Sequence, residues 1–76
     1  MKSTRWLFLV KRNDINYLRT TIESYDGMAV VSTVDPGRAI IALRISPGCE
    51  GAVSGLIQSL RKEEGIFIQG PREEEN

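Results

Sequence analysis

Residues 28–45, MAVVSTVDPGRAIIALRI, restrict the fold more than any other stretch, because two alternating runs of β-preferring residues flank a strong turn signal. We expect a β-hairpin that turns at residues 35–38, with Asp35 opposite Arg38. Pro-Gly favours a type II turn, whose twist suits a two-residue hairpin poorly, so a bulged loop with a one-residue slip of the first strand stays open. The register with Asp35 opposite Arg38 predicts four pairs on the face toward the core: Val34 with Ala39, Ser32 with Ile41, Val30 with Leu43 and Met28 with Ile45.

The segment before the hairpin predicts a strand and a helix. Residues 6–10, WLFLV, are apolar at every position, as expected for a central strand that is buried on both faces. Asn13 or Asp14 is a suitable N-cap for the helix, and Gly27 is a suitable stop. The apolar stripe of this helix has helical spacing and consists of Ile15, Leu18, Ile22 and Tyr25.

The segment after the hairpin predicts a second helix and a last strand. Residues 46–48, Ser-Pro-Gly, end the hairpin, and an apolar stripe from Cys49 to Leu60 indicates a helix that stops at Gly65. Residues 66–69 form a short final strand, which Gly70-Pro71 closes. Residues 71–76 are expected to be a disordered acidic tail.

The element order is therefore β-α-β-β-α-β, which predicts an α+β fold of the ferredoxin-like type. Right-handed crossovers place both helices on one face of a four-stranded antiparallel sheet in the order 4-1-3-2. A chain of 76 residues has room for one core, and we assign the single domain to residues 1–70.

Composition excludes several classes of function. Ten Lys and Arg balance ten Asp and Glu, so no net field favours nucleic acid or an anionic membrane. The chain has no histidine and only one cysteine, so we expect no metal, no cofactor and no enzymatic activity. No apolar run exceeds five residues and no signal-peptide pattern follows Met1, so we expect a cytoplasmic protein.

The helix-free face of the sheet is expected to be apolar whichever way the first strand faces. If Trp6, Phe8 and Val10 face the helices, leucines line the open side, and such a patch on a small domain marks an interface. The first hairpin strand is predicted to lie at the sheet edge, without a charged residue to block pairing. We predict a homodimer or higher homo-oligomer, the alternative being a monomer with covered surfaces. The predicted interface is Leu7, Leu9, Met28, Val31, Thr33, Ile40 and Ala42.

Residues 4–69 resemble the small ACT-like domains, which have the ferredoxin-like fold. More closely, the chain is similar to a bacterial family of short stand-alone proteins of unknown function in the pattern Asp14-Ile15, Tyr17-Leu18, Ile22-Glu23, Tyr25, Gly27, Thr33-Val34-Asp35, Ile45, Pro47-Gly48. ACT domains are regulatory modules that bind small ligands at subunit interfaces, through the loop after the first strand. The resemblance implies a ligand site in the corresponding loop, formed by Lys11, Arg12, Asn13 and Asp14.

Three functions stay open for this chain. The first is a non-enzymatic, oligomerising domain that binds a small anionic ligand between subunits. The second is an adaptor that docks a different protein on its apolar sheet face. The third, an RNA-binding module of the same topology, is disfavoured because residues 38–44 contain no aromatic side chain to stack a base. Cys49 is expected to be a small core residue, with a reactive thiol at a helix start as the alternative.

Overall fold

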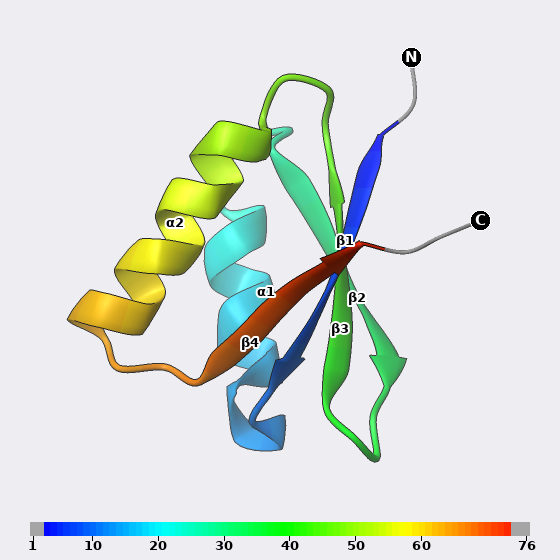
Figure 1. The fold of residues 1–76 in the computed structure, drawn as a ribbon, viewed down its shortest axis with the longest axis vertical. Coiled ribbons are helices and arrows are strands. Elements are labelled where there is room, and N and C mark those ends of the chain that lie inside the picture. The colour runs from blue at the N-terminus through cyan, green and yellow to red at the C-terminus, as the bar shows by residue number, and fades with distance from the viewer. Residues whose placement is uncertain (1–2, 74–76) are drawn as a thin grey trace.

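The computed structural model describes residues 3–73, which form one antiparallel sheet with two helices on one of its faces (Figure 1). The helices are α1 (Ile15–Glu23), which follows the 3-10 helix η1 (Arg12–Asp14), and α2 (Glu50–Glu63). The strands, which lie in the order β2-β3-β1-β4, are β1 (Thr4–Val10), β2 (Ala29–Asp35), β3 (Ile40–Ile45) and β4 (Ile68–Glu73). The predicted ferredoxin-like α+β fold and the predicted strand order are confirmed.

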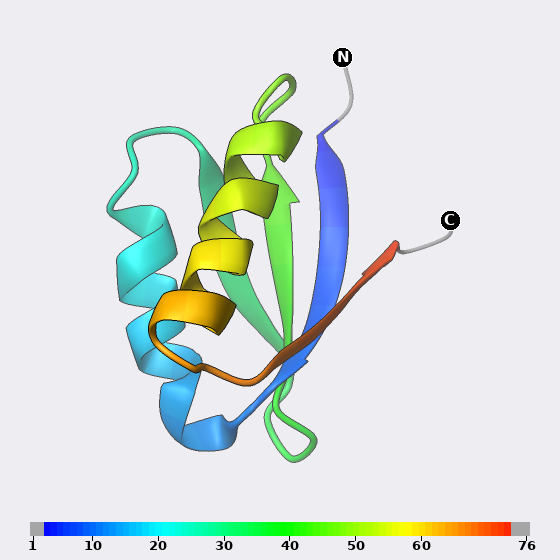
Figure 2. The same ribbon diagram turned by 60° about the vertical axis from the view of Figure 1, so that its left-hand side comes forward.

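The core lies between the sheet and the two helices, which stand side by side on the same face (Figure 2). β1 and β3 are the central strands, with Phe8 opposite Ile41 and Trp6 opposite Leu43. These side chains face the helices, where Leu18 of α1 and residues of α2 cover them. Because burying one large apolar side chain contributes about 1.5–3 kcal/mol, this layer supplies most of the stability of the fold.

The hairpin pairs one residue away from the register that we first predicted. Val31, rather than Val30, lies opposite Leu43, and Ala29 lies opposite Ile45. Val31 consequently faces the helices and is 4% exposed, whereas Val30 faces outward and is 59% exposed. The predicted inner face is therefore right for β3 and wrong for β2, since a slip of one residue turns every side chain of a strand over.

A loop longer than two residues causes this slip. Residues 36–39 connect the strands, and the Asp35 carboxylate accepts a hydrogen bond from the Arg38 amide at 3.1 Å. Ala39 has a φ of 58°, in the left-handed region, and the pairing shifts between Thr33 and Asp35. Of the two alternatives that the Pro-Gly sequence allowed, the structure therefore has the bulged loop.

The termini of the two helices are held by different groups. Asp14 occupies the N-cap position of α1 as predicted, but its side chain makes no capping hydrogen bond. At the start of α2 the Glu50 carboxylate accepts from the Thr4 hydroxyl at 2.7 Å and from the Gly48 amide at 3.1 Å. Gly65, with a φ of 65°, follows the C-cap of α2, as predicted.

β4 continues past Gly70-Pro71, where we predicted that the last strand ends. Arg72 lies opposite Leu7, and the pairing with β1 shifts between Leu7 and Leu9 around the cis Gly70-Pro71 peptide bond. An edge strand tolerates proline, because the missing N–H is not needed for a second ladder. The predicted disordered tail is therefore wrong for residues 71–73, and residues 74–76 of that tail lie outside the described residues.

At each edge of the sheet, a charged side chain from a helix makes hydrogen bonds with backbone groups of the edge strand. The Met28 carbonyl accepts from the Ser46 amide in the hairpin ladder, so alternation points the Val31 amide away from β3. The Glu23 carboxylate of α1 accepts a hydrogen bond from that amide at 2.8 Å. At the other edge, Arg61 of α2 donates from Nε to the Ile68 carbonyl at 2.8 Å and from Nη2 to the Gly70 carbonyl at 2.7 Å.

The β2 edge is therefore guarded at Val31, although the strand itself carries no guard. Glu23 lies outside the apolar stripe predicted for this helix, and only the packing of α1 over β2 shows that it reaches the strand. The expectation of an unguarded edge does not hold at this position.

We predict that Glu23→Ala lowers the free energy of unfolding by about 1–2 kcal/mol, because the Val31 amide loses a charge-assisted hydrogen bond. Urea unfolding measures the change. The matched control is Lys62→Ala, on the exposed face of α2, where a change within about 0.5 kcal/mol is expected. Equal stability of the two variants would contradict the guard role of Glu23.

The hydrogen bonds to Glu50, first that from Thr4, lower the pKa of its carboxyl. Its contribution to stability is therefore present above the pKa of an unfolded glutamate and is lost as the pH falls through the lower folded pKa. We expect Glu50→Gln, and in part Thr4→Val, to flatten the acid side of the curve of unfolding free energy against pH. Urea titrations between about pH 3 and 6 test this around the unperturbed pKa. A curve unchanged in both variants would refute it.

Candidate functional site

The open face of the sheet, which points away from the helices, carries apolar side chains of both central strands. Strand alternation places Leu7 and Leu9 of β1 on this face, together with Ile40 and Ala42 of β3. These residues were predicted as part of an interface, and the structure brings them together on one surface.

The other three predicted interface residues lie elsewhere, and the slipped hairpin register accounts for two of them, Val31 and Thr33. Met28 and Val31 are buried, and Thr33 lies opposite Ile41, on the helix side of the sheet. Val30 and Val34 take their place on the open face, where they are 59% and 44% exposed. The sequence reasoning missed these two valines because it assigned even-numbered residues of β2 to the core.

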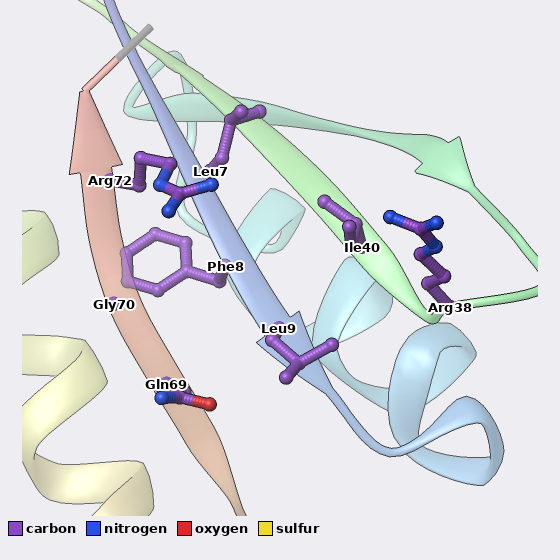
Figure 3. Close-up of a pocket in the computed structure, with 8 residues that line it drawn as sticks. All are labelled: Leu7, Phe8, Leu9, Arg38, Ile40, Gln69, Gly70 and Arg72. Carbon is purple, nitrogen blue, oxygen red and sulfur yellow. The ribbon is translucent and has the colours of Figure 1, made fainter.

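A hollow of about 490 Å³ lies in the open face, across β1 and between β3 and β4 (Figure 3). Its floor includes Leu7, Leu9 and Ile40, so it is largely apolar. Arg72 and Gln69 approach it from β4, on one side of β1, and Arg38 approaches from the β3 side (Figure 3). The hollow thus combines an apolar floor with cationic groups at its margins.

Basic residues gather on this face although the whole chain is neutral. Arg5 and Arg44 lie directly opposite each other on β1 and β3, and alternation puts both on the open side with Arg38 and Arg72. Asp35 lies beside one of these arginines, with its Oδ2 3.8 Å from Arg38 Nε.

The Arg72 side chain is exposed and makes no hydrogen bond or ion pair with residues 3–71. The sequence reasoning missed it as a site residue because it assigned residue 72 to a disordered tail. For the open face itself, a signal was present in the sequence. The alternations Arg5-Leu7-Leu9 and Ile40-Ala42-Arg44 place arginines beside apolar residues on one face of the sheet.

The loop that the ACT-like resemblance points to lies away from the hollow. Lys11, Arg12 and Asn13 are exposed, and Asp14 is half-buried with its amide donating to the Lys11 carbonyl at 2.9 Å. Arg12 Nη2 donates to the Gly37 carbonyl at 3.3 Å, which ties this loop to the hairpin loop. None of these four residues lines the hollow.

Other candidate chemistry is limited in the described part of the chain. Cys49 is half-buried at the N-cap of α2 and packs against the core. Among the described side chains, those of residues 3–72, no three His, Cys, Asp or Glu are grouped so that they could hold a metal ion. Over the same residues, neither helix has the length and apolar character needed to cross a membrane.

Gly70 allows β4 to approach β1 at the side of the hollow. Its φ is +139°, and a Cβ there would lie 2.8 Å from the Leu7 carbonyl oxygen and 3.0 Å from Phe8 Cδ1. A side chain at this position would therefore push β4 away from β1.

We expect Gly70→Ala to lower the free energy of unfolding by about 1–3 kcal/mol, through backbone strain and overlap with β1. The control is Gly55→Ala, on α2, where an added Cβ meets nothing within 4 Å and alanine favours the helix. Thermal unfolding should show opposite changes in the two variants. A shift in the same direction in both would refute this account of Gly70.

Comparison with known proteins gives one family. Residues 8–63 match a family model described as "Domain of unknown function (DUF4911)". The matched range contains Leu9, Arg38 and Ile40 of the hollow, whereas β4 with Arg72 lies beyond it. Searches of curated proteins and of solved structures found no match.

Proposed function

We propose that this chain, which belongs to the DUF4911 family, is a non-enzymatic binding domain that holds a small anionic ligand on its open sheet face. The observation that carries the proposal is the hollow of about 490 Å³, which has an apolar floor and arginines at its margins. This volume lies within the range of about 300–1,000 Å³ that is typical of small-molecule sites. A guanidinium binds a carboxylate or phosphate through paired hydrogen bonds, and the leucines would cover the apolar part of the ligand.

Binding is favoured over catalysis by the side chains that line the hollow. They are those of leucine, isoleucine, phenylalanine, arginine and glutamine, with one glycine. None of these offers the nucleophile or the general base on which most hydrolytic and transfer reactions depend. The hollow can therefore hold and orient an anion, and we assign it no reaction.

The ACT-like interpretation and the homo-oligomer belong to the same proposal, with the ligand site moved from the loop to the sheet face. Pairing of two β2 edges would have to displace Glu23 from the Val31 amide. Contact between two open faces would bring the arginines of the two hollows, Arg38 and Arg72, close to those of the other subunit, and like charges at an interface are costly. A homodimer through this face is therefore expected to need the anionic ligand between its subunits.

An adaptor function is the second candidate, and the exposure of Val30 and Val34 favours it. These valines extend the apolar surface from the hollow to the β2 edge, beyond the reach of a small molecule. A protein partner on this surface would have to be acidic, because the arginines of the open face surround the apolar residues.

A thermal-shift screen of amino acids, carboxylates, nucleotides and phosphorylated metabolites tests the proposal. A ligand at 100 times its Kd should add about 2.7 kcal/mol to the free energy of unfolding. Arg72→Gln should remove most of this gain, whereas Lys62→Gln, on the exposed face of α2, should retain it. Light scattering on the same samples reports whether the ligand produces a dimer.

Two outcomes would contradict ligand binding at the hollow. Equal stabilisation of the wild type and of Arg72→Gln would place the ligand elsewhere. The absence of any stabilising compound, together with specific binding of an acidic protein that Arg72→Gln abolishes, would favour the adaptor.

A further inference from the structure

The two arginines of the hollow stand on different sides of its apolar floor. Arg72 belongs to β4 and lies opposite Leu7, while Arg38 belongs to the loop that leads into β3. β1 runs between them, so Leu7, Leu9 and Ile40 separate the two guanidinium groups (Figure 3). One compact anion centred on either arginine would not pair with the other.

We infer that the ligand carries two anionic groups, one at each end of an apolar segment, as a linear dicarboxylate does. This inference rests on the proposed function and names the chemical class of ligand for the same hollow. One carboxylate pairs with Arg72 and the other with Arg38, while the methylene segment lies on the floor.

The Arg72 end of the hollow is ready to accept a carboxylate. No hydrogen bond or ion pair joins this side chain to residues 3–71, so binding there breaks no contact within that part of the chain. Gln69 lies on the same strand and on the same side of the hollow, and its amide can donate a further hydrogen bond.

The Arg38 end is also available, although Asp35 is near. The Asp35 carboxylate lies 3.8 Å from Arg38 Nε, and the two side chains are 41% and 81% exposed, so the pair is weak. The two terminal nitrogens of the Arg38 guanidinium remain open to the second carboxylate. A ligand with an ammonium group at this end would instead meet a like charge, which disfavours amino acids and diamines.

Isothermal titration calorimetry of the wild-type domain with paired ligands tests the inference. The probes are linear dicarboxylates of increasing length and the monocarboxylates of equal chain length. At the best length the dicarboxylate should bind about tenfold tighter or more, as one further charge-assisted hydrogen-bonded pair provides. Arg38→Gln and Arg72→Gln should each reduce this ratio to near one, and Lys62→Gln should leave it unchanged.

The possible outcomes separate the inference from the proposed function. Equal affinities of the two ligand classes for the wild type would overturn the two-ended ligand and leave anion binding standing. Binding of some other anion from the screen, with no binding of dicarboxylates at any length, would do the same. If no anion of any class binds, the proposed function itself is overturned. The ratio of dicarboxylate to monocarboxylate affinity is measured on the wild type, so this part of the test does not depend on the folding of a variant. A thermal melt of each variant confirms that it is folded.

Discussion

The contact between Arg61 and β4 is the interaction on which the candidate site depends. The guanidinium of this α2 residue donates to the carbonyls of Ile68 and Gly70, and so anchors the last strand against the rest of the sheet. With the strand held there, Gly70 approaches the Leu7 carbonyl and Arg72 reaches the hollow. A single helix residue thus closes the sheet edge and positions one wall of the site.

The other edge follows the same physical rule with the opposite charge. An edge strand presents amides and carbonyls in alternation, and an acidic side chain can satisfy the first as a basic side chain can satisfy the second. Glu23 accepts from the Val31 amide, and Arg61 donates to the β4 carbonyls. Both groups come from the helices that also cover the core. The open face is the face of the sheet that the helices leave uncovered.

The open face also shows how a neutral chain can present a basic surface. Its ten basic and ten acidic residues cancel in composition, but strand alternation places Arg5 and Arg44 on the same side of the sheet as Arg38 and Arg72. The local field at the hollow is set by these neighbours, and distant acids on the helices are screened over about 10 Å at moderate salt. The net charge of the chain therefore does not describe this face of the sheet.

The sequence by itself determined the element order, the strand order and the placement of both helices on one face, because periodicity, turn residues and crossover handedness are local or general properties. It also identified Leu7, Leu9, Ile40 and Ala42 as residues of the open face. Only the tertiary structure decided the hairpin register, the path of β4 and the placement of Arg38 and Arg72 on two sides of one hollow. The Pro-Gly sequence is compatible with more than one loop, and the register follows from the loop of residues 36–39 that forms in the folded hairpin. The two arginines are far apart in the chain, and only the folding of β4 back along β1 brings them to one hollow.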